Sequence, residues 1–176
     1  PIGIAGATTT YNLLAGFNGL EAGQGIIILG FLSYVAYVTG SPWLSVVGLI
    51  MVAALFGFLL YNKYPAKVFP GDSLTWTIGA LIAGMAILGN FEKIAVFVFI
   101  PYIMETVLKL RGKLEKQSFG KPMKDGSLDL KYTKIYGVEH LAIYAIKKAN
   151  IQPTEKKVVY LIHGFQLFLI IIAINS

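Results

Sequence analysis

The sequence predicts an all-α polytopic membrane protein with about five transmembrane helices, a hairpin outside the membrane and an amphipathic helix at its surface. Two observations carry this prediction. Of the 176 residues, 56% are hydrophobic and only 14% are charged, whereas soluble domains are about 25% charged. The apolar residues also form long runs without charge or strand alternation, and about 20 such residues cross a bilayer as a helix.

Five runs are interpreted as crossings. Residues 22–62, 73–91 and 158–176 contain no charged side chain, and the turn-like Thr39-Gly-Ser-Pro42 divides the first of them. A fourth run begins at Ile94. The predicted crossings are residues 22–39, 43–61, 73–90, 93–110 and 157–175.

The basic residues predict which side each loop faces. Loops on alternate sides place the segment before residue 22, the loop 62–72 and residues 111–156 on one face. Of the 15 Lys and Arg residues, 14 lie in these segments or, as Lys109 and Lys157 do, at the ends of the crossings next to them, and Lys93 lies on the other face. Because cytoplasmic loops are rich in Lys and Arg, we expect this face to be cytoplasmic. Topology alone is a sufficient explanation for most of these lysines.

The long polar segment, residues 110–156, is predicted to be a cytoplasmic loop. Lys124-Asp-Gly-Ser127 is a tight-turn signal and predicts a short hairpin. Residues 135–149 place their apolar side chains on one stripe, which predicts an amphipathic helix in the membrane interface.

The ends of the chain and its composition limit the other possibilities. The run from Pro1 to Leu20 has no charge and no basic segment before it, unlike a secretory signal peptide. We expect residues 1–176 to be the C-terminal half of a single multi-span domain. Cysteine is absent, which excludes disulfides and Cys metal sites.

Asn12-Leu-Leu-Ala-Gly-Phe-Asn-Gly-Leu-Glu21 is an unusually polar interruption between apolar runs. Polar groups at a membrane boundary are costly and are often functional. Helix capping and turn formation explain Asn and Gly equally well. Gly16 and Gly19 would let a planar ligand approach the backbone closely. The predicted topology places this segment on the same face as Asp72.

A second motif is Tyr61-Asn-Lys-Tyr-Pro-Ala-Lys-Val-Phe-Pro-Gly-Asp72. Asp72 either N-caps the next crossing or takes part in a Mg²⁺ or phosphate site, because carboxylates hold Mg²⁺ and Mg²⁺ bridges phosphates. Phe69 either faces the membrane or stacks on a base. An acidic, amide-lined pocket under the basic segment 111–134 would suit a metal-bound anionic substrate.

The histidines and some glycines are interpreted structurally. No cluster of possible metal ligands surrounds His140 or His163 in the sequence, so neither is proposed as catalytic. His163 lies in the last crossing, where we expect it to hydrogen-bond to another helix. The spacing of Gly79 and Gly84 is interpreted as helix packing.

Residues 12–24 and 62–72 resemble the two signatures of the UDP-GlcNAc:dolichyl-phosphate GlcNAc-1-phosphate transferases, within the polyprenyl-phosphate N-acetylhexosamine-1-phosphate transferase superfamily. Their order and the predicted topology match as well. Bacterial members that load undecaprenyl phosphate usually have Asp-Gly at the position of Ala15-Gly16 and Asp at that of Asn18. The chain therefore resembles the eukaryotic and archaeal branch, and its Ile- and Lys-rich composition favours an archaeon.

The resemblance implies a Mg²⁺-dependent membrane enzyme. Such an enzyme transfers GlcNAc-1-phosphate from UDP-GlcNAc to a dolichyl-type polyprenyl phosphate and releases UMP, the first lipid-linked step of N-glycan assembly. By this resemblance, Asp72 is a catalytic residue that binds Mg²⁺ or the pyrophosphate. Asn12 is the second catalytic residue and contacts the phosphates.

The resemblance also implies the substrate-binding residues. Gly16 and Asn18 would read the uracil, Phe69 would pack on it, and Glu21 would support the site. Relatives carry His or Arg in the last cytoplasmic loop, touching the sugar or diphosphate. Residues 111–134 contain no His, and their one Arg is Arg111, so Lys121 is the expected substitute. Relatives also often have Asn where this chain has Thr9.

The expected partners are UDP-GlcNAc, a polyprenyl (dolichyl) phosphate and the membrane, either the archaeal plasma membrane or the ER membrane. A homodimer is compatible with this interpretation, and no nucleic-acid partner is expected. An acidic pair that the family keeps in an earlier cytoplasmic loop is not within these residues, so we predict that they are inactive alone.

Three alternatives remain open at this stage. One is a related transferase with another UDP-sugar or with undecaprenyl phosphate. The second is a transporter in which Asp72 and Asn12 line an ion path. The third is a structural membrane subunit whose polar motifs are helix caps.

Overall fold

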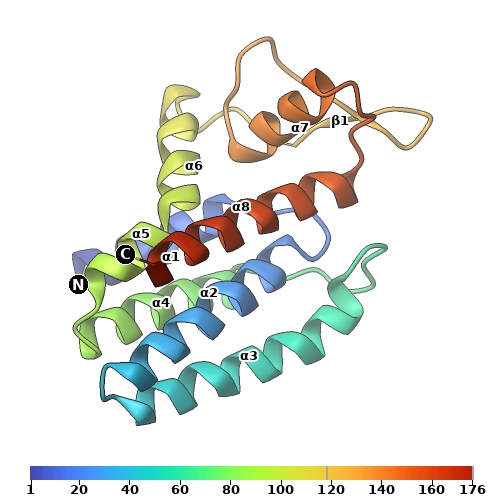
Figure 1. The fold of residues 1–176 in the computed structure, drawn as a ribbon. Helices are drawn as coiled ribbons and strands as arrows, with labels where there is room; N and C mark the ends of the chain where they lie inside the picture. Colours follow the sequence, from blue (N-terminus) through green and yellow to red (C-terminus); the bar gives the residue numbers. More distant parts are fainter. Residues whose placement is uncertain (118, 176) are drawn as a thin grey trace.

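The computed structural model describes residues 1–117 and 119–175 and is mostly helical (Figure 1). The predicted all-α class is therefore confirmed. The helices are α1 (Ile2–Leu13), α2 (Leu20–Val38), α3 (Pro42–Asn62), α4 (Asp72–Leu88), α5 (Glu92–Val98), α6 (Ile100–Arg111), α7 (Val138–Lys148) and α8 (Glu155–Asn175).

Among the described residues, three helices are long and apolar enough to cross a membrane: α2, α3 and α8. Helix α4 is apolar but has 17 residues, at the lower limit of about 17–25 for a crossing. The predicted crossing 93–110 is divided at Phe99 into α5 and α6. Pro101 explains this break, because proline lacks an N–H and its ring collides with the preceding turn. The predicted count of five crossings is therefore not confirmed.

Small and polar residues allow the helices to pack closely. Helix α1 lies on α4, and a Cβ atom at Gly79 would lie 2.7 Å from the Ala7 carbonyl oxygen, which confirms the packing interpretation of Gly79. The same interpretation of Gly84 is wrong, because a Cβ atom there would meet open space among the described residues. The buried Gln166 of α8 donates to the Val98 carbonyl of α5 at 2.9 Å. His163 Nε2 lies 3.3 Å from the Leu20 carbonyl oxygen of α2. The helix–helix hydrogen bond predicted for His163 is thus confirmed.

The polar segment contains the predicted hairpin. Strands β1 (Lys121–Pro122) and β2 (Leu128–Asp129) pair antiparallel, with Lys121 opposite Asp129. The predicted amphipathic helix is α7, whose buried side includes Ile143 and Ile146. Helix α7 is joined to α6 by Glu105, whose Oε2 accepts the Val138 N–H at 2.5 Å.

Four connecting segments meet at one end of the helices (Figure 1). These are the α1–α2 connection (residues 14–19, here the motif loop), the α3–α4 connection (residues 63–71), the hairpin (residues 121–129) and the turn before α8 (residues 149–154). The polar segments that the sequence predicted to share one face of the membrane thus lie together in the structure.

Candidate functional site

Side chains from three helices hold the motif loop. Gly16 and Gly19 have φ angles of +119° and +79°, which glycine adopts without steric cost. Three backbone N–H groups of the loop donate to side-chain oxygens. The pairs are Gly16 with Glu21 Oε1 at 2.6 Å, Asn18 with Glu155 Oε1 at 2.6 Å, and Gly19 with Asn62 Oδ1 at 3.1 Å.

Glu21 and Asn62 are buried behind this loop, with exposed fractions of 3% and 0%. The Tyr11 hydroxyl donates to the Glu21 carbonyl oxygen at 2.6 Å, so the start of α2 is tied to α1. The Asn62 Nδ2 donates to the Val68 carbonyl oxygen at 2.9 Å. Asn62 therefore connects the motif loop to the segment that carries Phe69 and Asp72.

The structure brings Asn12 to the first turn of α4, which begins at Asp72. The Thr75 hydroxyl lies 2.7 Å from Asn12 Oδ1 and 3.2 Å from the Asp72 carbonyl oxygen. Thr75 is buried, whereas the Asp72 residue is exposed. The two predicted catalytic residues thus belong to adjacent helix ends, 60 positions apart in the sequence.

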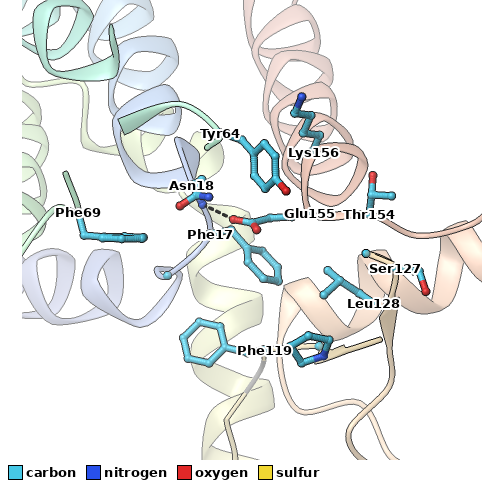
Figure 2. A pocket seen from close by; sticks show the side chains of 14 residues that line it. Phe17, Asn18, Tyr64, Phe69, Phe119, Ser127, Leu128, Thr154, Glu155 and Lys156 are labelled. Atoms are coloured by element: carbon cyan, nitrogen blue, oxygen red, sulfur yellow. Dashed lines mark hydrogen bonds between the residues drawn. The ribbon is translucent and has the colours of Figure 1, made fainter. Parts of the chain in front are cut away.

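A pocket of about 690 Å³ lies beside the motif loop (Figure 2). Of the predicted substrate-binding residues, Gly16, Asn18 and Phe69 line it. Among the described residues, its lining does not include Asn12, Glu21, Asp72 or Lys121.

The opposite wall comes from the hairpin region and the start of α8. Phe119 packs its ring edge on Phe17, with centroids 6.1 Å apart, and a Cβ atom at Gly16 would overlap the Phe119 ring. The remaining lining residues are Tyr64, Gly120, Pro122, Gly126, Ser127, Leu128, Thr154, Glu155 and Lys156. Gly16 is therefore required both by its backbone angle and by the ring next to it.

Charged side chains around the hairpin are mostly exposed. Lys121 lies between two lining residues but is itself exposed. The Ser127 hydroxyl and N–H hydrogen-bond to Asp125 and lower the pKa of its carboxyl group. Lys147 lies 2.6 Å from Asp129 and lowers the pKa of Asp129. These contacts tie the hairpin turn together and attach β2 to α7.

His140 lies outside the pocket lining, on α7. Its ring meets the Tyr132 ring edge to face, with centroids 5.7 Å apart. Burial lowers the pKa of His140, which favours the neutral imidazole at pH 7.

The described residues contain no group of three or more His, Cys, Asp or Glu side chains that could hold a metal ion. Asp72 is an exposed acid whose backbone carbonyl lies near the Thr75 hydroxyl, and the same hydroxyl contacts the Asn12 amide oxygen. Mg²⁺ often takes one or two carboxylates and fills its other positions with water and substrate phosphates. The donor set at Asp72 fits such a shared ion rather than a metal centre built from these residues alone.

The sequence did not single out Thr75, Glu155 or Tyr64 as site residues. Glu155 lies just before the predicted crossing 157–175, and nothing in its neighbours in the sequence indicates a contact 137 positions away. Tyr64 and Asn62 lie within the second motif, so their place in the motif was the available signal.

The apolar helices and the pocket at their ends are those of an integral membrane protein with a cavity beside the helix termini. The sequence model of glycosyl transferase family 4 matches residues 1–90. The chain belongs to this family, and the resemblance seen in the two motifs is confirmed.

Individual relatives agree with this assignment. A Saccharolobus solfataricus protein, provisionally named a UDP-N-acetylglucosamine–dolichyl-phosphate N-acetylglucosaminephosphotransferase, is 40% identical over 131 residues, 73% of this chain and 40% of the relative. A Sulfolobus acidocaldarius protein of the same name is 35% identical over 166 residues, 93% of this chain and 49% of the relative. The Phospho-N-acetylmuramoyl-pentapeptide-transferase of Halalkalibacterium halodurans is 33% identical over 118 residues, 62% of this chain and 36% of the relative. The chain thus spans less than half the length of each of these relatives.

Proposed function

We propose that the protein containing this chain transfers GlcNAc-1-phosphate from UDP-GlcNAc to a dolichyl-type polyprenyl phosphate and releases UMP. The observation that carries the proposal is the pocket, where residues of both family motifs, Gly16, Asn18 and Phe69, converge. The family and the names of two archaeal relatives support the reaction class. The proposal includes five crossings, with the pocket on the cytoplasmic face.

The geometry supports a division of labour between the pocket and the α1–α4 contact. The base would lie against Phe69 and the backbone of Gly16 and Asn18, which the pocket exposes. The phosphates would extend toward Asn12 and Asp72. Bound Mg²⁺ would neutralise charge that develops on the phosphates.

The reaction balances as a single displacement at phosphorus. An oxygen of the lipid phosphate attacks the β-phosphorus of UDP-GlcNAc and forms a new P–O bond. The bond from the β-phosphorus to the bridging oxygen breaks, and that oxygen leaves with UMP. The product is GlcNAc-diphospho-lipid. Positioning and electrostatic stabilisation dominate catalysis of such transfers, and the Asn12 amide and the hairpin residue Lys121 would contribute to both.

The test uses the full-length protein that contains this chain. Wild-type protein in detergent should exchange labelled UMP into UDP-GlcNAc in the presence of Mg²⁺ and GlcNAc-diphospho-polyprenol. Asp72→Asn should lower this rate about 100-fold or more, as loss of a charged group at a transfer site does. Glu92→Gln is the matched control, because Glu92 starts α5 and does not line the pocket.

A transporter would move a solute without forming UMP from UDP-GlcNAc, whether or not Mg²⁺ and a lipid acceptor are present. Wild-type protein that moves a solute but neither releases nor exchanges UMP would contradict the proposal. We also propose that the 176 residues alone are inactive, and UMP release by that fragment would contradict this second statement.

A second candidate keeps the reaction but changes the substrates. Two bacterial relatives are named as a phospho-N-acetylmuramoyl-pentapeptide-transferase and as an undecaprenyl-phosphate N-acetylglucosaminyl 1-phosphate transferase. A panel of UDP-GlcNAc, UDP-GalNAc and UDP-MurNAc-pentapeptide, each offered with dolichyl and undecaprenyl phosphate, separates the candidates. Preference for UDP-GlcNAc with the dolichyl acceptor is the expected result.

A further inference from the structure

Glu155 reaches the motif loop from the opposite end of the chain. It is the first residue of α8, and its Oε1 accepts the Asn18 N–H at 2.6 Å. Figure 2 shows this bond at the centre of the pocket wall. Both residues line the pocket, and Glu155 belongs to neither family motif.

The contact completes a set of three. The N–H groups of Gly16 and Gly19 are held by side chains of α2 and α3, and that of Asn18 is held by α8. Leaving a backbone N–H without an acceptor in the folded state costs free energy. Each acceptor therefore favours the loop conformation in which its hydrogen bond is made. The Asn18 backbone conformation determines where its side-chain amide can point into the pocket.

Two further contacts hold the start of α8 in place. The Lys156 ammonium lies 4.9 Å from the centre of the Tyr64 ring, so α8 contacts the α3–α4 connection. The Leu128 N–H donates to the Pro153 carbonyl oxygen at 2.9 Å, which ties β2 to the residues just before Glu155. The start of α8 and the residues just before it therefore link the motif loop, the second motif and the hairpin wall, and Glu155 makes the contact to the motif loop.

We infer that Glu155 is a positioning residue that sets the selectivity of this pocket for a uracil nucleotide over a cytosine nucleotide, by holding the Asn18 backbone so that the Asn18 amide meets the base. This inference rests on the proposed function. It concerns nucleotide affinity and base selectivity rather than the bond-breaking step, because Glu155 contacts the loop of Asn18 and not the α1–α4 contact of Asn12 and Asp72.

The experiment compares Glu155→Ala and Glu155→Gln in the full-length protein. The alanine variant should raise the KM for UDP-GlcNAc and the Kd for UMP about tenfold, the effect of one lost hydrogen bond. It should also lower the ratio of UMP to CMP affinity, while the KM for the lipid phosphate and kcat stay within about twofold. The glutamine variant keeps an oxygen acceptor and should recover most of the affinity. Glu115→Ala is the control, because Glu115 is exposed and lies outside the pocket lining.

Three results overturn the inference while the proposed function stands. The first is an active wild type together with unchanged UMP affinity in Glu155→Ala. The second is an equal loss of affinity for UMP and for the lipid phosphate in this variant. The third is a loss of UMP affinity that follows reduced thermal stability, without any change in the ratio of UMP to CMP affinity. A wild type that forms no UMP and binds none rejects the proposed function itself. The two failures are therefore distinguishable.

Discussion

The motif loop and the hairpin form opposite walls of one pocket, but they are held by different interactions. Three N–H groups of the motif loop donate to side chains from three helices. Two of these side chains, Glu21 and Asn62, are buried. The hairpin has two paired positions in its strands and exposed polar contacts to its neighbours. Buried hydrogen bonds are costly to lose, whereas exposed ion pairs contribute little.

This difference indicates which wall of the pocket should determine ligand specificity. A loop whose Gly16, Asn18 and Gly19 N–H groups are held by side chains of three helices tolerates few substitutions, so it suits recognition of one base. A hairpin on exposed contacts can adjust to a sugar or a lipid phosphate. The following predictions break or sharpen this comparison, from the largest expected effect to the smallest.

Gly16→Ala and Gly126→Ala compare glycines with positive φ in the two walls. A Cβ atom at Gly16 would overlap the Phe119 ring, whereas the space around Gly126 is open. Gly16→Ala should raise the Kd for UMP about 100-fold or more, while Gly126→Ala should bear only the backbone strain of about 1 kcal/mol. Calorimetric titration with UMP measures both. Equal losses in the two variants would show that the walls are equally rigid.

Glu21→Ala removes the acceptor of the Gly16 N–H. An unpaired donor at a part-buried position costs about 1–3 kcal/mol, so UMP affinity should fall by about 10-fold or more. Glu21→Gln retains a side-chain oxygen and should lose less. If the alanine variant binds UMP as tightly as wild type, the motif loop does not depend on this buried carboxylate.

Asn62→Ala removes the hydrogen bonds to Gly19 and Val68. We expect a loss of thermal stability in detergent of about 1–2 kcal/mol together with weaker UMP binding, because both motifs lose a shared anchor. Asn175→Ala is the control, since the exposed Asn175 bonds within its own helix. The same change in both variants would argue against a special role for Asn62.

Asp129→Asn tests the hairpin wall and should have the smallest effect. The Asp129–Lys147 pair is exposed, so the melting temperature and kcat should stay within error. Lys147 lowers the pKa of Asp129. Any contribution of the pair to stability is therefore present at neutral pH and is lost as pH falls below the ordinary Asp pKa of about 4. A large activity loss at pH 7 would show that the hairpin is held as firmly as the motif loop.

Much of the fold follows from local pattern. Charge-free runs located α2, α3, α4 and α8 to within a few residues, because an apolar helix is recognisable from its own composition. The Asp125-Gly126 turn and α7 were also predicted, since turn chemistry and helical periodicity are local properties. The division of residues 93–110 was missed, because the apolar composition masked the effect of Pro101.

The candidate site was also predicted only in part. The motif spelling indicated Gly16, Asn18 and Phe69, and these residues do line one pocket. The family resemblance also suggested Lys121, as a substitute for the His or Arg of relatives, and Lys121 is exposed beside that pocket rather than in its lining. The roles of all these residues stay predictions until the variants are measured.

The sequence by itself determined the helical class, the family and the polar segments that meet at one face, because composition, periodicity and motif spelling are properties of neighbouring residues. Only the tertiary structure decided that Thr75 meets Asn12 and that Glu155 meets Asn18. The physical reason is that a hydrogen bond between distant elements depends on how the helices approach each other. The residues next to each partner in the sequence do not indicate how the helices pack.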